Sequence, residues 1–171
     1  MGNDGYNKIL FSVSSGLSKD GWAFTLLGGK TWGDGYIQGT DFEGYNYFAS
    51  LSKRFNDNHQ LTLSAFGAPQ WHNQRNYNNA LTIKEWQRVQ QFMGEKSAYR
   101  YNPTFGYRKG QAFNSNRNAY HKPQISLNHL WQIDHKSSLS TALYASIGRG
   151  NGYSGTGTCL LYTSPSPRDI S

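Results

Sequence analysis

The residues best suited to chemistry gather in one long stretch without regular patterning, residues 72–121, and at its entrance. Aromatic side chains are interspersed there with arginines and asparagines. Aromatic faces offer apolar contact area and guanidinium and amide groups donate hydrogen bonds, so the combination suits a sugar or an anionic chelate. The same residues could instead pack the loop onto itself, and both interpretations stay open. The proposed ligand-binding residues are Trp71, His72, Trp86, Tyr99, Tyr101, Phe105, Tyr107 and Arg108, with Arg75, Tyr77, Arg88 and Arg100 nearby.

Other reactive residue types show no spacing that predicts catalysis or a metal site. No H-x-x-x-H or E-x-x-H spacing occurs among the five histidines. Asp34, Asp41 and Glu43 could hold a cation, but solvated loop carboxylates are the simpler interpretation. The run from Gly29 to Thr31 is similar to the end of a phosphate loop, yet Phe24 stands where that motif needs glycine. We therefore predict no catalytic residue, no cofactor and no metal, and a protein that is not an enzyme.

Composition indicates an ordered chain with unusually little apolar content. Hydrophobic residues make up 36% of the 171 residues, whereas aromatic residues reach 15%, and the mean hydropathy is −0.73. A barrel with a polar lumen fits these values, and so does a β-sandwich. The formal charge of +7 is spread over turns and loops without a run of three basic residues, so we expect no nucleic-acid partner.

The stretch Tyr45–Trp71 predicts the fold most clearly. Apolar residues alternate with small polar ones on both sides of Asn56-Asp57-Asn58, whose side chains can bond their own backbone in a tight turn. Each strand runs to about ten residues, the length that crosses a membrane in a β-barrel. The residues expected on the apolar face are Tyr45, Tyr47, Ala49, Leu51, Phe55, Leu61, Leu63 and Ala65.

Similar alternation predicts further strands at about residues 6–17, 22–32, 122–133 and 138–147. Short turns at 18–21, 56–58 and 134–136 alternate with long connections at 33–44, 72–121 and after 148. An up-and-down meander places all short turns at one end, as in outer-membrane barrels. We therefore predict an all-β, antiparallel meander of about six strands, forming part of a large outer-membrane β-barrel.

The long loop 72–121 contains one helix signal. Thr82 to Glu85 have the spacing of a capping box, Trp86, Val89 and Met93 lie near one face, and Gly94 suits the helix end. We predict one short helix there.

The last residues do not continue the pattern. The run CLLYTSPSPRD, beginning at Cys159, has no alternation, and its prolines cannot join a strand ladder. It is similar to a translated reading frame of the transposase adapter used in DNA library preparation. We therefore interpret residues 1–157 as the barrel segment and residues 158–171 as a non-native tail, and we expect the true N-terminus to be missing because no apolar leader opens the chain.

Several strand sequences are typical of one family: GYIQGTDFEGYNYF (35–48), LSKRF (51–55), LTLSAFGAPQWH (61–72), HKPQISLNH (121–129) and ASIGRG (145–150). They resemble the barrel of TonB-dependent outer-membrane receptors of Gram-negative bacteria. The resemblance covers residues 6–157. It implies a piece of a barrel of about 22 strands that is closed by a plug.

The resemblance also implies a function and partners. Such a receptor would import a scarce ligand (an iron chelate, cobalamin or a glycan) across the cell outer membrane. Its partners would be outer-membrane lipid, the TonB complex through a plug absent here, and a surface lipoprotein. The alternatives are another outer-membrane barrel, such as a porin or an adhesin, and a secreted carbohydrate-binding β-sandwich.

Overall fold

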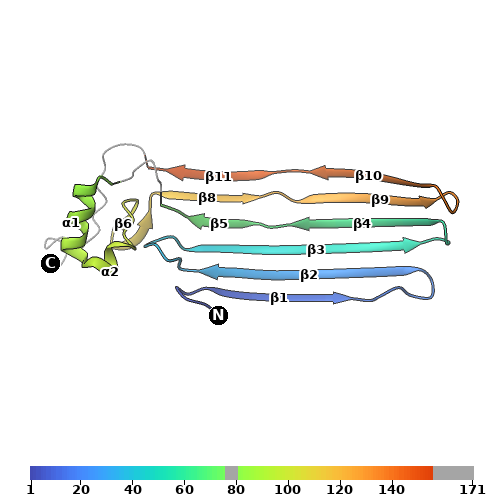
Figure 1. The fold of residues 1–171 in the computed structure, drawn as a ribbon, viewed down its shortest axis with the longest axis horizontal. Coiled ribbons are helices and arrows are strands. Elements are labelled where there is room, and N and C mark those ends of the chain that lie inside the picture. The colour runs from blue at the N-terminus through green and yellow to red at the C-terminus, as the bar shows by residue number, and fades with distance from the viewer. Residues whose placement is uncertain (76–80, 156–171) are drawn as a thin grey trace.

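The computed structural model describes residues 1–75 and 81–155, and most of them lie in one antiparallel sheet (Figure 1). The Tyr77 of the predicted ligand site and the tail at 158–171 lie outside the described residues. The main sheet contains β1 (Asn7–Ser14), β2 (Trp22–Gly33), β3 (Phe42–Arg54), β4 (His59–Gly67), β5 (Gln70–Asn73), β8 (Asn116–His121), β9 (Gln124–Gln132), β10 (Ser138–Ser146) and β11 (Arg149–Ser154).

These nine strands form six long rows, which confirms the predicted meander. Three rows consist of two strands in line: β5 continues β4, β9 continues β8, and β11 continues β10. The first two interruptions fall at Pro69 and Pro123, which lack the N–H that a ladder requires. The third falls at Gly148. Within the described residues the sheet is open, because the β1 row and the β10 row each pair on one side only.

The predicted alternation of short and long connections is confirmed as far as β10. The connections β1–β2, β3–β4 and β9–β10 lie at one end of the sheet, which we call the turn end (right in Figure 1). The connections β2–β3 and β5–β8 lie at the opposite end, the loop end. A meander requires this arrangement, because successive strands reverse direction.

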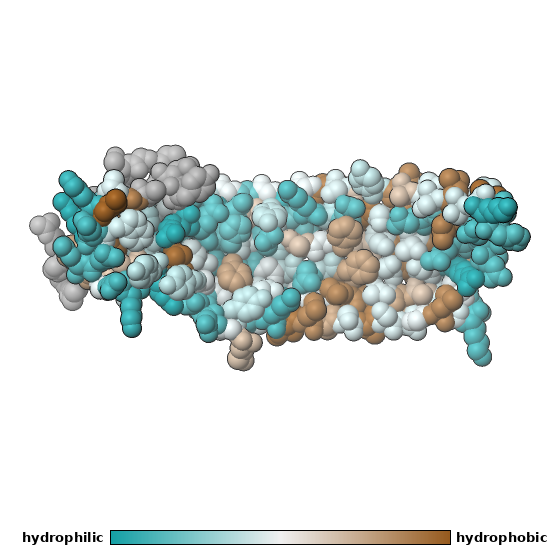
Figure 2. All heavy atoms as spheres, viewed as in Figure 1, coloured by the Kyte–Doolittle hydropathy of each residue, from teal (hydrophilic) through white to brown (hydrophobic). Residues whose placement is uncertain are grey.

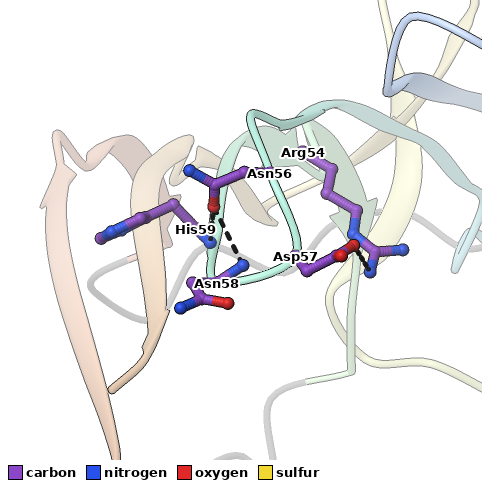
Figure 3. A network of polar contacts seen from close by, with 5 residues as sticks. All are labelled: Arg54, Asn56, Asp57, Asn58 and His59. Carbon is purple, nitrogen blue, oxygen red and sulfur yellow. Dashed lines mark hydrogen bonds and ion pairs between the residues drawn. The ribbon is translucent and has the colours of Figure 1, made fainter. Parts of the chain in front are cut away.

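The β3–β4 turn closes in the way its sequence predicts (Figure 3). The Asn56 side-chain oxygen accepts hydrogen bonds from the backbone N–H groups of Asn58, at 2.9 Å, and His59, at 2.8 Å. Arg54 pairs with Asp57 across the turn, with 2.9 Å between Nη2 and Oδ1. None of residues 56–58 has a positive φ, so the turn uses the bonding capacity of asparagine and not its tolerance of left-handed backbone.

The long connection holds more structure than its sequence indicated. The predicted helix is confirmed as α1 (Ile83–Met93), with both bonds of the Thr82–Glu85 capping box and Gly94 at its end. A four-residue helix, α2 (Glu95–Ala98), and a hairpin of β6 (Phe105–Arg108) and β7 (Gln111–Asn114) follow. The prediction of a loop up to residue 121 was wrong, because β8 already begins at Asn116. No helix in the described part of the chain is long and apolar enough to cross a membrane.

A second correction concerns residues 148–157, which we expected to form a glycine-rich loop. The glycines are there, but residues 149–154 pair with β8 as β11. The β1–β2 register runs through Gly28 and Gly29 without a bulge. The ring of Phe11 lies over Gly28, with its nearest atom 2.6 Å from where a Cβ would be. Gly28 therefore makes room for an aromatic ring on the next strand.

The two faces of the sheet differ in chemistry. Cross-strand register places aliphatic and aromatic residues of all six rows on one side, which we call the apolar face. These side chains are mostly exposed, for example Leu51 at 46% and Leu143 at 64%. The face includes Ile9, Phe11, Val13, Trp22, Phe24, Leu26, Ala49, Leu51, Leu61, Leu63, Ala65, Ile125, Leu127, Trp131, Leu139, Leu143 and Ala145.

The opposite, polar face carries small hydroxyl and amide side chains that bond one another across strands. Ser14 bonds Thr25 at 2.9 Å, and Ser52 bonds Thr62 at 2.9 Å, in each case between side-chain oxygens. Figure 2 shows this face, where teal and white residues predominate along the strands and brown ones are scattered. The sheet is therefore amphipathic, yet no second layer covers its apolar face within the described residues.

Candidate functional site

The loop end is built around a core of buried polar side chains. Asn102, Thr104, Asn114 and Asn116 are each at most 5% exposed, and Ala98 is the one buried apolar residue among those described. Buried polar groups are costly unless they are hydrogen-bonded. The contacts of these four residues therefore decide whether the loops form a rigid body, which we call the loop platform (residues 34–41, 73–75 and 98–116).

Asn102 links the platform to the β2–β3 connection. Its Nδ2 donates to the backbone oxygen of Gln38 at 2.8 Å, and its Oδ1 accepts from the backbone N–H of Thr104 at 3.1 Å and from the Thr104 hydroxyl at 2.7 Å. Gln38 in turn donates its N–H to the carbonyl of Arg100 at 2.8 Å. Two connections far apart in sequence are thereby fixed to each other.

Asn114 makes the second link. Its Nδ2 donates to the carbonyls of Gly39, at 2.6 Å, and Gln74, at 3.2 Å, and its Oδ1 accepts from the N–H of Asn116 at 2.8 Å. Gly39 has a φ of +63°, and a Cβ at that position would overlap the ring of Phe105. The glycine is therefore needed both for the backbone conformation and for the close approach of the β6 strand.

The predicted aromatic residues partly pack on one another. Trp86 of α1 meets Tyr101 edge to face, with ring centroids 6.2 Å apart, and Phe105 meets Tyr107 at 5.9 Å. Arg108 lies 5.8 Å from the ring centroid of Phe113. These contacts favour the interpretation that the loop packs onto itself, whereas Tyr99 and Tyr107 remain exposed at 57% and 50%.

Trp71 and His72 do not share a site. They are consecutive on β5, so their side chains point to opposite faces of the sheet. Trp71 lies on the apolar face beneath the guanidinium of Arg117, 4.3 Å from its ring centroid. His72 lies on the polar face and meets Tyr120 edge to face, at 6.4 Å. The structure therefore separates the eight predicted residues into groups.

The polar face contains a hollow near His72 and Tyr120. It measures about 310 Å³ and is lined by Phe42, Asn46 and Gln70, among others. Gln70 also donates to the hydroxyl of Tyr120 at 2.6 Å. Amide, hydroxyl and aromatic groups thus converge on the polar face directly below the loop platform, which is suitable for contact with a polar ligand.

Local contacts explain the shifted pKa values of Glu85 in α1 and of Tyr101 in the platform. The backbone N–H and hydroxyl of Thr82 bond the carboxylate of Glu85 and lower its pKa, because hydrogen bonds to the charged form favour that form. Partial burial raises the pKa of Tyr101, and the charge of Glu85 adds to this shift. Neither shift brings the group near neutral pH, and neither suggests an acid–base catalyst.

Two of the three acidic residues weighed for a cation site, Asp41 and Glu43, are bound by protein partners. Asp41 accepts from the Asn73 amide at 2.9 Å, and Glu43 pairs with Lys30 at 2.8 Å. In the described part of the chain, no three His, Cys, Asp or Glu side chains are placed to hold a metal ion. The predicted absence of a metal site stays a prediction for the complete chain.

Sequence reasoning missed the residues that organise this end. Asn102, Asn114 and Asn116 looked like ordinary loop residues, since nothing in a sequence distinguishes a buried asparagine from a solvated one. Arg117 and Arg149 were missed because β8 and β11 lack apolar alternation. Arg117 lies shortly before the predicted strands at 122–133 and 138–147. This position was the one signal in the sequence that could have pointed to Arg117 as a functional residue.

Comparison with known proteins adds no assignment. No family model, curated protein or solved structure matches the chain.

Proposed function

We propose that this chain is a segment of a transmembrane β-barrel in an outer membrane, with the apolar face toward lipid and the polar face toward the lumen. The observation that carries the proposal is the band of exposed apolar residues that crosses all six rows on one face only. A barrel in lipid has to be closed so that every backbone group is paired. The proposal therefore includes further strands that pair with β1 and with β10.

The dimensions of the band match a bilayer. On the β3 row the outward residues from Tyr45 to Phe55 span ten steps, or about 33 Å along the strand and about 25 Å in height at the usual tilt. Aromatic residues border the band on both sides, as they do at membrane interfaces. Trp22, Phe55 and Trp131 lie at its turn-end border, and Trp32, Tyr45, Tyr47 and Trp71 at its loop-end border.

The band is also slanted relative to the hydrogen-bonded rows, which supports tilted strands. Its centre on β1, Phe11, is in register with Tyr47 of β3. Its centre on β9, His129, is in register with Lys53 of β3. The six-residue offset is about 20 Å across four strand spacings of about 4.8 Å, a slope near 45°.

The outermost row gives a smaller slope in the same direction. The centre of the band on β10, Leu143, is in register with Leu51, which corresponds to about 13 Å across five spacings and a slope near 30°. Strands of outer-membrane barrels tilt by about 35–45° from the barrel axis. A horizontal lipid layer across tilted strands would produce this slant, whereas a core under a second sheet gives no reason for it.

The one lysine on the turn-end part of the apolar face is placed as a membrane border would require. Lys53 extends to the turn, where its Nζ donates to the carbonyl of Asp20 at 2.7 Å and lies 4.6 Å from the ring centroid of Trp22. Its charge therefore lies at the border and its methylene groups face the band, as expected of a lysine that snorkels.

Within this class, we propose a TonB-dependent receptor that imports a scarce ligand such as an iron chelate, cobalamin or a glycan. The strand sequences support it through their resemblance to that family. The hydrogen-bonded loop platform, which includes the guanidinium of Arg100, and the hollow on the polar face offer aromatic, amide and guanidinium groups at the lumen mouth. Outer-membrane lipid, a TonB complex acting through a plug, and a surface lipoprotein would be its partners.

A test of the membrane location uses the complete barrel that contains this segment, refolded with and without phosphatidylcholine vesicles. We expect this barrel to require lipid or detergent, and we expect trypsin to cut the loop end, at Lys84, Arg88 and Arg108, while the band is protected. A chain that stays soluble and monomeric in plain buffer and does not bind vesicles would instead favour the carbohydrate-binding β-sandwich.

The receptor assignment has its own test. The gene that contains this segment should encode a plug domain and a TonB box ahead of the barrel. A barrel gene without a plug would favour the porin or adhesin alternative, and it would leave the membrane location intact.

A further inference from the structure

A hollow of about 410 Å³ opens on the outward side of the sheet, beyond the loop-end border of the band. Its floor is Ala119, whose register neighbours are Trp71 on β5 and Asn151 on β11. Arg117 and His121 stand two residues to either side of Ala119 on the same strand, so they share its face. The hollow exists because the small side chain of Ala119 is surrounded by larger ones.

The hollow combines aromatic surface with positive charge. The guanidinium of Arg117 lies over the Trp71 ring, and Arg149 is the register partner of His121. Among the described residues neither arginine forms an ion pair. The carboxylate that lines the hollow, Glu43, is already bound by Lys30 at 2.8 Å and by the Tyr45 hydroxyl at 2.7 Å. The two arginines therefore give the hollow a net positive charge.

The position relative to the band limits what can reach it. His121 lies four residues beyond Ile125, the last large aliphatic outward residue of that row. That is about 13 Å along the strand and about 10 Å in height at the tilt argued above. The hydrocarbon layer ends near Ile125, so His121 lies beyond the headgroup layer of ordinary lipids, which is about 5–7 Å deep.

We propose that the hollow binds a phosphorylated sugar headgroup of a glycolipid in the outer leaflet. Guanidinium groups bind phosphate in a bidentate manner, and Trp71 and Asn151 offer a ring face and an amide for the sugar. A sugar headgroup extends further from the hydrocarbon than a simple phosphodiester and so reaches the hollow. The inference rests on the proposed membrane location.

The test measures affinity for deep-rough lipopolysaccharide in mixed detergent micelles, for the complete barrel that contains this segment and for its Arg117→Gln/Arg149→Gln variant. Each arginine should contribute about five-fold to the affinity, as a cation near an anionic lipid surface does. A matched control, Lys19→Gln/Lys136→Gln, removes the same charge at the turn end and should bind like wild type. Unchanged affinity of the arginine variant, or equal weakening of both variants, would overturn the proposal.

Two further arms separate the possible failures. Quenching of tryptophan fluorescence by brominated phosphatidylcholine reports insertion for every variant, so a chain that inserts but does not select the glycolipid contradicts this inference alone. Soluble glucose 1-phosphate tests the source of the phosphate. If it competes as well as the lipopolysaccharide at equal concentration, the site is one for a free sugar phosphate and the lipid assignment is wrong.

Discussion

The two ends of this molecule are stabilised in opposite ways. Toward the turn end, the sheet buries almost nothing and exposes large apolar side chains such as Phe11, Leu63 and Leu143. At the loop end, the platform buries Asn102 completely and Asn114 almost completely, and it satisfies their hydrogen bonds within the protein. The loop platform therefore has polar side chains in its interior, whereas the turn-end part of the sheet has apolar side chains on its surface.

The difference indicates which part depends on its surroundings. Exposed apolar surface of this extent is unfavourable in water and is expected only where something covers it. A buried hydrogen-bonded network, in contrast, keeps its geometry in water. We therefore expect the turn-end part of the sheet to fold only in lipid or detergent, and the platform to hold its shape once the strands beneath it are fixed.

The largest effect should come from a charge on the apolar face. Leu63→Arg places a cation near the middle of the band and should destabilise the inserted state by about 2–4 kcal/mol. Ser64→Arg is the matched control, because the next residue of β4 points to the polar face. Urea-dependent folding in phosphatidylcholine vesicles measures both. Equal costs at the two positions would contradict the assignment of the faces.

The next effect concerns the platform. Asn102→Ala removes three hydrogen bonds and leaves the Gln38 carbonyl and the Thr104 N–H without their Asn102 partners, while the Thr104 hydroxyl keeps its bond to Gln74, which should cost about 2–3 kcal/mol of local stability. Faster hydrogen exchange at the Thr104 amide would report it. Asn58→Ala, at an exposed position of the turn end, should have little effect there. If the band and the platform unfold together in the Asn102 variant, the two regions are not independently stable, which would contradict the comparison.

A glycine pair separates backbone strain from packing. Gly39 and Gly16 both have positive φ, at 63° and 67°, but only Gly39 lies against Phe105. Gly16→Ala should cost about 1 kcal/mol for the strained backbone, whereas Gly39→Ala should cost about 1–3 kcal/mol more because the Phe105 ring has to move. Thermal unfolding in detergent compares them, and equal losses would show that the contact with β6 is unimportant.

The smallest effect is a pH dependence confined to α1. The pKa of Glu85 is lower in the folded state than in the unfolded chain, so its contribution is complete above the ordinary glutamate pKa. It is lost as the pH falls through the lowered folded value. Helix content of α1, followed by NMR of residues 83–93, should decrease over that acidic range. Glu85→Gln should flatten the dependence and leave the strands unaffected.

Much of the sheet could be predicted from the sequence because its physics is local. Period-two alternation identified β1, β2, β3, β4, β9 and β10, and turn chemistry identified the Asn56 and Asp134 turns, where side-chain oxygens accept backbone N–H groups as expected. The capping box located α1 for the same reason. A local pattern with a local cause can be seen in the chain itself.

The remainder depends on contacts between distant residues. β8 and β11 have few apolar residues, and they are strands because each pairs with a row already in place. Asn102 and Asn114 are buried because Gln38, Gly39 and Gln74 meet them from other segments. The eight proposed ligand-binding residues were grouped by composition, which cannot indicate that Trp71 and His72 point to opposite faces.

The central claim, that the apolar face meets lipid, is tested most directly by labelling the two faces separately. Single cysteines replace Leu63 or Ser64 in the complete barrel that contains this segment, with any other cysteine changed to serine, and each carries a bimane fluorophore in vesicles with brominated acyl chains. We predict strong quenching by the lipid at position 63, and at position 64 weak quenching by lipid but strong quenching by aqueous iodide. Equal quenching by lipid at both positions, or none at position 63, would contradict the claim.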